Sequence, residues 1–257
     1  MFHHPTSKIA GFDARPVHPF WTAASRAWRR KAVAILTTAV CLNLFAAGAA
    51  SAAAVAAPPP VAVTPAPAPR AGQADFLGAP ASSDARRMAD WVVRTGDSRG
   101  TPFVIVDKKG ARVFVFDGRG RLLGAASALL GLARGDDSAP GVGDRKLSEI
   151  RPEERTTPAG RFVASLGQDL GERDVLWVDY AAALALHPVL AANTREYRLE
   201  RLAAASPFEH RITFGCINVA ASFYDRVVHP AFTGTSGVVY ILPEVKSLSE
   251  VFSAFAS

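Results

Sequence analysis

The sequence predicts a mainly β domain with a few helices, an α+β fold, which follows an N-terminal segment of different composition. Short apolar runs separated by glycine-containing turns recur beyond residue 100, and this pattern is typical of β-hairpins. Helical periodicity is confined to a few short stretches. The first fifth of the chain has the composition of an export signal and a spacer, so we expect one folded domain over 83–257.

Residues 1–52 have the layout of an export signal. Six Lys/Arg and one acidic residue precede Ala53, so this leader carries 6 − 1 = +5 of the formal net charge of +6. A basic stretch over 26–31 is followed by an uncharged apolar stretch and by the small-residue site Ala50-Ser51-Ala52. We expect export to the periplasm or cell envelope. The leader is either cleaved or kept as a membrane anchor, because the uncharged stretch is long enough to span a bilayer.

Residues 53–82 form an Ala/Pro-rich linker. Proline favours extended polyproline II, and the stretch 53–72, which is almost wholly Ala, Pro and Val, has no residues that build a core. The remainder of the chain is close to neutral, with 29 − 6 = 23 basic and 23 − 1 = 22 acidic residues. The high isoelectric point therefore belongs mostly to the leader, and we expect no nucleic-acid partner.

The elements of the domain follow from local patterns. Ser83 is the expected N-cap of a helix that Gly96 ends, since serine caps helix starts and glycine adopts the left-handed conformation past helix ends. Further helices are expected over 195–204 and 220–228. Strands are expected over 103–106, 113–116, 121–126, 162–164, 175–178, 183–187 and 237–242. The polar, glycine-rich segment 131–155 is long for a loop in a compact domain, so we interpret it as a functional lid.

The chain has two cysteines, Cys41 in the leader and Cys216. If the leader is removed, the one remaining thiol cannot form an internal disulfide. A leftover cysteine outside the cytoplasm indicates an intermolecular bridge, a reactive thiol or a buried structural residue.

The residues around Cys216 favour the reactive thiol. The chain alternates like a strand up to Phe214, and Asn218 is a good N-cap for the helix expected next. This arrangement places Cys216 at a helix N-terminus, where the helix dipole lowers a thiol pKa and favours a thiolate. Gly215 allows close backbone approach, and the N–H groups of Gly215 and Cys216 would hold a developing oxyanion.

A cysteine nucleophile needs a base, and the region after the leader has three histidines. His187 ends an expected strand, so its ring can project into a cleft, and we favour it. His210 lies six residues before Cys216, and His229 lies near the end of an expected helix. Both stay as alternatives.

Three sequence elements resemble the YkuD-type L,D-transpeptidase catalytic domain. The segment Thr213-Phe214-Gly215-Cys216-Ile217-Asn218 is similar to the family's cysteine motif, and Thr157-Pro158-Ala159-Gly160-Arg161-Phe162 is similar to its Thr-Pro-x-Gly-x-Phe segment. His187 stands where the family has its histidine, and 237–243 resembles its last strand. Three features differ from the family. Phe214 replaces a motif histidine, Pro188 replaces a glycine after His187, and 193–209 is an insertion. The resemblance implies a YkuD-like β-sandwich or barrel in a divergent subgroup.

The resemblance also implies a reaction on peptidoglycan stem peptides. Cys216 would attack the donor peptide, His187 would transfer the protons, and an amine acceptor would resolve the thioester. Arg211 would pair with a substrate carboxylate or brace the site, or it lies on the solvent face of a strand. Thr213 would hydrogen-bond near the thiol, and Asn218 would cap a helix or contact the substrate. We expect no cofactor or metal, because one Cys and three scattered His lack ligand spacing. We also expect a monomer that meets membranes only through an uncleaved leader.

Two other functions remain open at this stage. The same cysteine would serve a stem-peptide hydrolase, a carboxypeptidase or endopeptidase, if water resolved the acyl-enzyme. A non-catalytic wall-binding module with an inert thiol belongs to a different class. Thiol reactivity separates the module from the enzymes, and the reaction products separate the two enzymes.

Overall fold

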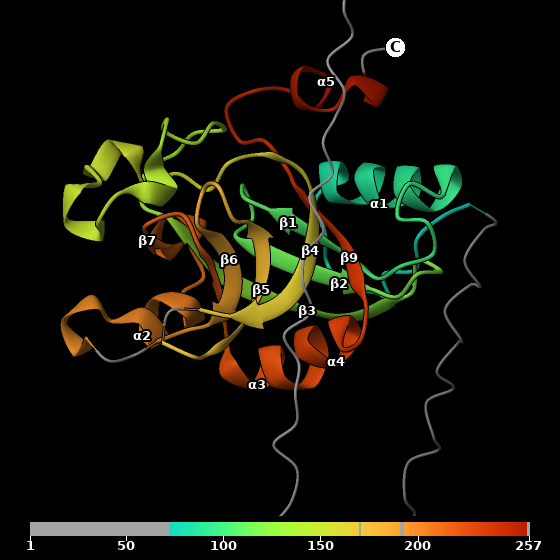
Figure 1. The fold of residues 1–257 in the computed structure, drawn as a ribbon. Helices are drawn as coiled ribbons and strands as arrows, with labels where there is room; N and C mark the ends of the chain where they lie inside the picture. The colour runs from blue at the N-terminus through green and yellow to red at the C-terminus, as the bar shows by residue number, and fades with distance from the viewer. Residues whose placement is uncertain (1–71, 170, 191–192, 256–257) are drawn as a thin grey trace, which may run out of the picture. The chain divides into compact units, whose positions relative to one another are not determined.

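The computed structural model describes residues 72–169, 171–190 and 193–255. The expected leader and most of the expected linker lie outside these residues. Within them, the mainly β prediction is confirmed: the domain has nine strands and several short helices (Figure 1). The strands are β1 (Phe103–Asp107), β2 (Arg112–Phe116), β3 (Leu122–Gly131), β4 (Gly160–Gln168), β5 (Asp174–Asp179), β6 (Leu184–Pro188), β7 (Arg211–Thr213), β8 (Ile217–Val219) and β9 (Ser236–Ile241).

Eight of these strands close into a ring. The hydrogen-bonded order is β2-β1-β9-β4-β5-β6-β8-β3, and β3 pairs with β2 again. Closure removes the exposed edges that an open sheet would have. The short strand β7 adds to β3 outside the ring. Neighbours are antiparallel except for β1–β9, β6–β8 and β3–β7. The parallel pair β6–β8 brings together two segments that the expected site needs.

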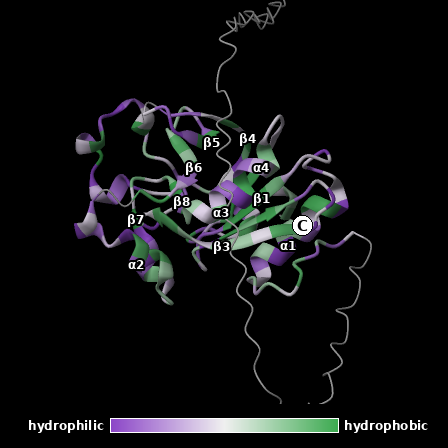
Figure 2. Ribbon diagram, turned by 90° about the horizontal axis from the view of Figure 1, so that it is seen from below, coloured by the Kyte–Doolittle hydropathy of each residue, from purple (hydrophilic) through white to green (hydrophobic). Residues whose placement is uncertain are grey.

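The strands separate two hydrophobic cores. In β1, Val104 and Val106 point into the core inside the ring, whereas Phe103 and Ile105 point into a second core beneath a helix. All five residues of β1 are buried, because both of its faces are covered. In the view of Figure 2, hydrophobic residues gather in the central strands, and hydrophilic residues are frequent in the peripheral loops.

The second core lies under α1 (Ser83–Thr95), which buries Met88 and Val92. The helix begins one residue earlier than expected, since Ser82 is its N-cap, and it ends at Gly96 in the left-handed conformation with φ 66°. Residues before the expected domain boundary also belong to this layer. Phe76 packs edge-on against two phenylalanines of β2, and residues near it bond to the turn after β2.

The remaining helices are α2 (Arg198–Ala203), α3 (Ala221–Phe223), α4 (His229–Phe232) and α5 (Leu248–Val251). A π-helical segment, Tyr224–Val228, joins α3 to α4, so the helix expected over 220–228 continues to Phe232. Strand β3 is longer than expected and ends at Gly131. The polar segment after it folds into three short 3₁₀ turns, Val142–Asp144, Leu147–Glu149 and Pro152–Glu154.

Candidate active site

Cys216 lies in a tight connection between β7 and β8. The hydroxyl of Thr213 donates to the Cys216 carbonyl at 2.7 Å and accepts from the Gly215 N–H at 3.2 Å, so it bridges the turn. Gly215 has φ 137°, and a Cβ there would approach the Thr156 carbonyl oxygen to 2.8 Å. Only glycine fits this position without strain. Thr213 therefore bonds locally near the thiol, as expected.

Thr157 ties this turn to the rest of the barrel. It is fully buried, its hydroxyl donates to the Gly215 carbonyl at 2.7 Å, and it accepts from the Gly131 N–H at 2.9 Å. The threonine of the Thr-Pro-x-Gly segment thus holds the backbone next to Cys216. This contact gives a physical reason for the co-occurrence of the two motifs in one chain.

His187 lies on β6 in parallel register with Asn218 of β8. Its Nδ1–H donates to the Pro188 carbonyl at 2.8 Å, and its Nε2 lies 2.9 Å from the Asn218 side-chain amide nitrogen. Because a carbonyl only accepts, Nδ1 carries the proton and Nε2 holds the lone pair. The amide of Asn218 donates to that lone pair.

Asn218 is not the helix cap that we expected. It is buried inside β8, and the next helix, α3, begins after Ala220. Its side-chain oxygen accepts from Arg198 Nη1 at 2.9 Å. Since arginine only donates, this bond orients the amide so that its NH₂ group faces His187. The physical reason for the correction is tertiary: the chain after Cys216 pairs with β6 before it turns helical.

Arg198 comes from the inserted segment 193–209, at the start of α2. Its side chain is 14% exposed and also pairs with the Glu196 carboxylate. Sequence reasoning did not select Arg198. The one signal that could have pointed to Arg198 was the insertion itself, because it adds a charged helix next to Asn218.

The prediction of a lowered thiol pKa is wrong for this arrangement. No helix starts at Cys216, so no helix dipole acts on the sulfur. Burial raises the pKa of the Cys216 thiol, although hydrogen bonds from the backbone N–H groups of Ala185 and Cys216 and the charge of Arg198 act in the opposite direction. The thiol contacts the Ala183 carbonyl oxygen at 3.6 Å.

The pKa of His187 is lowered. Burial is the main cause; the bond to the Pro188 carbonyl opposes it, and the charges of Arg173 and Arg198 add to it. Both shifts favour the neutral form of the group, the imidazole of His187 and the thiol of Cys216. Among the described residues, no hydrogen bond joins Cys216 to His187.

Both groups nevertheless line one cavity of about 250 Å³. The strand alternation explains this arrangement, because side chains of adjacent residues point to opposite faces. Leu184 and Leu186 point into the barrel core, so Ala185 and His187 point outward. Outward residues of neighbouring strands and of the segments that adjoin them complete the wall: Arg173, Val175, Trp177, Thr213, Cys216 and Asn218. Leu147 of the predicted lid segment also lines the cavity.

Phe214, at the position of the family's motif histidine, lines the same cavity. The guanidinium of Arg155 lies 4.0 Å from the centre of its ring, a cation–π contact. Arg155 also donates to the Ile150 carbonyl at 3.0 Å. The ring of Phe214 therefore attaches the segment before β4 to the turn that carries Cys216. A histidine at this position would bind the Arg155 guanidinium less well through its ring face.

Arg211 does not reach the cysteine cavity. Its side chain is 10% exposed and pairs with the buried Glu244 carboxylate, and it donates to the Lys108 carbonyl at 3.0 Å. It therefore braces the domain, and neither the substrate-carboxylate role nor a place on a solvent face describes it. The cause is a contact between residues distant in sequence: the chain after β9 brings Glu244 next to Arg211, and the local sequence around Arg211 does not reveal this.

The other two histidines lie elsewhere. His210 is buried, and its ring nitrogens lie 3.0 Å from the Ala128 carbonyl and 3.1 Å from the Ala204 carbonyl. It joins β3 to the end of α2. His229 lines a different cavity. Of the three candidates, His187 alone lines the cavity of Cys216.

The Gly215 N–H, which we expected to hold an oxyanion, already donates to Thr213. Within the described ranges, no group of three or more His, Cys, Asp or Glu side chains has the spacing of a metal site. No helix in the part of the chain that the structure describes has the length and apolar character to cross a membrane.

Comparison with known proteins gave structural matches alone. No protein-family model matches the chain, and no curated protein matches its sequence. The structure is similar to that of the L,D-transpeptidase LdtMt1 in complex with imipenem, with a TM-score of 0.30 and 14% identity over 55% of this chain and 59% of that chain. It is also similar to the catalytic domain of the E. faecium L,D-transpeptidase, with a TM-score of 0.30 and 14% identity over 56% of this chain and 98% of that chain.

Proposed function

We propose that this protein is a cysteine-dependent peptidoglycan L,D-transpeptidase of the cell envelope. The observation that carries the proposal is the shared cavity of Cys216 and His187, which are 29 residues apart in sequence (216 − 187) and face the same side of the β6–β8 pair. The motif resemblance around Cys216 and Thr157 supports the choice of reaction. The similarity in structure adds nothing to this argument.

The first step forms an acyl-enzyme. Cys216 sulfur attacks the carbonyl carbon of the third residue of a tetrapeptide stem, and His187 Nε2 accepts the thiol proton. The bond to the terminal D-Ala breaks, and the D-Ala nitrogen takes that proton from His187. A thioester joins the stem peptide to Cys216, and free D-Ala leaves.

The second step resolves the thioester. An amine nitrogen attacks the thioester carbonyl, the carbon–sulfur bond breaks, and the amine proton returns to the sulfur through His187. The products are a new amide and the free thiol. The Cys216 N–H, rather than that of Gly215, stabilises the oxyanion in both steps.

Proton transfer in this site requires substrate. In the free protein the pKa of the thiol is raised and that of the imidazole is lowered, and Asn218 occupies the Nε2 lone pair. A stem peptide that enters the cavity excludes water and brings its own polar groups to Arg198 and Asn218. Release of Nε2 from the Asn218 amide then makes the base available to the thiol.

The test is an intact-protein mass spectrum at short times with a disaccharide tetrapeptide, with Cys216→Ala as the control. We expect the wild-type protein to gain the mass of the stem lacking D-Ala and the variant to gain nothing. Amide products would support transfer, whereas a free tripeptide would indicate hydrolysis. Absence of any adduct, together with a folded Cys216 that resists thiol reagents, would leave a wall-binding module as the better hypothesis.

A further inference from the structure

His187 lines a second cavity that the expected reaction does not use. This cavity has a volume of about 440 Å³, against about 250 Å³ for the cavity of Cys216. Arg173, Val175 and Leu190 also line both cavities, whereas Cys216 lines the smaller one alone. The two cavities therefore adjoin at His187. A ligand in the larger one lies next to the base without displacing the acylated cysteine.

The wall of the larger cavity contains an unsatisfied hydroxyl. Tyr224 is 2% exposed and lines the cavity, and its hydroxyl has no hydrogen-bond partner among the described residues. A buried polar group without a partner costs about 1–3 kcal/mol. By contrast, the hydroxyl of Tyr240, in the second core, donates to Asp97. The Tyr224 hydroxyl is thus the kind of group that a ligand would satisfy.

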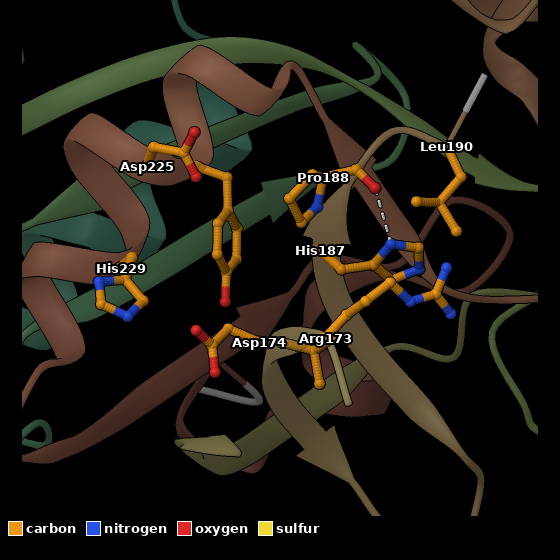
Figure 3. A pocket seen from close by; sticks show the side chains of 9 residues that line it. Arg173, Asp174, His187, Pro188, Leu190, Asp225 and His229 are labelled. Atoms are coloured by element: carbon orange, nitrogen blue, oxygen red, sulfur yellow. Dashed lines mark hydrogen bonds between the residues drawn. The ribbon is translucent and has the colours of Figure 1, made fainter. Parts of the chain in front are cut away.

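Two carboxylates share this cavity with the hydroxyl. Asp174 begins β5 and Asp225 follows Tyr224 in the π-helical segment. Figure 3 shows Asp174, Asp225 and His229 at one end of the cavity and His187 beside Arg173 at the other. Burial first, and then the charges of Asp174 and Asp225, raise the pKa of Tyr224, so its hydroxyl stays protonated.

The oxygens at this end match one chemical group. A primary ammonium has three N–H donors and one positive charge. The two carboxylates supply acceptors and the compensating charge, and the hydroxyl oxygen supplies a third acceptor. A neutral sugar hydroxyl would leave the carboxylates without a cation, and an anion would be repelled by them.

We propose that this cavity binds a primary ammonium group and that it holds the amine acceptor of the transfer reaction. The acceptor role rests on the function proposed above, whereas the ammonium site does not. His229 takes one proton from the ammonium, and the neutral nitrogen leaves the carboxylates, moves along the cavity past His187 and attacks the thioester on Cys216. The carbon–sulfur bond breaks, His187 passes a second proton from nitrogen to sulfur, and the first proton goes to solvent. One thioester and one ammonium thus give one amide, one thiol and one proton.

The binding experiment uses the isotopically labelled full chain and glycinamide, a small primary ammonium compound. We expect glycinamide to shift the NMR signals of Tyr224 and of the amides of Asp174 and Asp225. Tetramethylammonium, which has no N–H donor, is expected to shift none of them. Equal responses to the two cations, or no response to glycinamide, would overturn the ammonium site.

Two variants make the test specific. Tyr224→Phe is expected to weaken glycinamide binding about tenfold without lowering the thermal midpoint, because the removed hydroxyl has no partner. Asp174→Asn is expected to weaken it similarly. The control, Tyr240→Phe, removes a partnered hydroxyl and is expected to lower the midpoint while leaving glycinamide binding unchanged. Wild-type binding by Tyr224→Phe would contradict the proposal.

The acceptor role has its own readout. With a tetrapeptide donor, Tyr224→Phe and Asp174→Asn should form the acyl-enzyme at the wild-type rate but require about tenfold more amine for transfer. If glycinamide binds and no acyl-enzyme forms in any protein, the transpeptidase function fails and the ammonium site stands. If the acyl-enzyme forms and the amine requirement is unchanged in both variants, the acceptor role fails.

Discussion

At the scale of single residues, Cys216 shows that sequence position does not set a thiol's reactivity. Burial raises its pKa, and no helix N-terminus lies beside it to lower the pKa. Thr157 and Thr213 act through the backbone, since the Thr157 hydroxyl donates to the Gly215 carbonyl and the Thr213 hydroxyl donates to the Cys216 carbonyl. The position of Cys216 therefore depends on neighbouring hydroxyl groups as much as on the cysteine itself.

The raised thiol pKa predicts a pH dependence. Alkylation of Cys216 by iodoacetamide in the folded protein should be slow at pH 7 and rise steeply above about pH 9, because the thiolate reacts and an unperturbed thiol has a pKa of about 8.5. His187→Gln should change this profile little, since no hydrogen bond joins the two side chains in the free protein. A rate that is already high and constant from pH 6 to 8 would mean a resting thiolate and would contradict this account.

Thr157 gives a prediction for stability. Thr157→Val removes the hydroxyl that satisfies the Gly131 N–H and the Gly215 carbonyl, so it should reduce the free energy of unfolding by about 1–3 kcal/mol. Thr157→Ser keeps the hydroxyl and should recover most of that loss in urea titrations. Equal stability of the valine and serine variants would show that the two hydrogen bonds contribute nothing.

At the scale of elements, the inserted segment before β7 is part of the site. Helix α2 carries Arg198, which orients the Asn218 amide, and that amide in turn meets Nε2 of His187. These contacts link the insert to β8, and β8 to β6, although the three elements are not contiguous in sequence. The insertion thus supplies a residue that orients the side chain in contact with the candidate base, His187.

Replacement of Arg198 tests whether these contacts position His187. Arg198→Met should slow acyl-enzyme formation about tenfold, equivalent to about 1.4 kcal/mol in the barrier, because the Asn218 amide, which orients the His187 ring until substrate enters, loses its own fixed orientation. Arg195→Met changes an exposed arginine of the same insert and serves as the matched control. Rates of acyl-enzyme formation, measured by mass spectrometry of samples quenched at set times, should differ between the two variants. Equal rates would show that α2 does not act on His187.

At the scale of the whole molecule, a buried ion network joins distant parts of the barrel. Lys108 and the carboxylates of Asp136 and Glu244 are almost completely buried, and Lys108 Nζ lies 2.7 Å from Asp136. Asp136 also accepts from the backbone N–H groups of 244–246. These bonds outweigh the burial cost and lower the pKa of Asp136 to about 2. The network fixes the start of the lid segment to the chain after β9.

Removal of the central charge should destabilise the whole domain. Lys108→Met leaves the buried Asp136 carboxylate without its cation, whereas Glu244 keeps Arg211, and breaking a buried pair typically costs about 3–5 kcal/mol. Lys109→Met, one residue further and 52% exposed at its side chain, should change the free energy of unfolding by less than about 1 kcal/mol. Urea unfolding of both variants gives the comparison. Similar values would mean that the network is energetically neutral.

Local pattern was sufficient for much of the fold. Helix α1 and strands β1, β2, β5 and β9 were predicted within about two residues, because capping residues, glycine turns and apolar runs are short-range signals. Cys216 and His187 were selected for the same reason, from a motif and a strand end. The expected export, the partners and the oligomeric state stay predictions.

The sequence by itself determined a β-rich domain and selected Cys216 and His187 as the candidate nucleophile and base. Tertiary structure alone decided that Asn218 faces the base instead of capping a helix, that Arg198 completes the site and that Arg211 and Lys108 belong to a buried ion network. It also decided the resting protonation of the thiol. The physical reason is that pKa values and hydrogen-bond partners depend on groups brought together by strand pairing across long stretches of chain, and these pairings leave no local mark in the sequence.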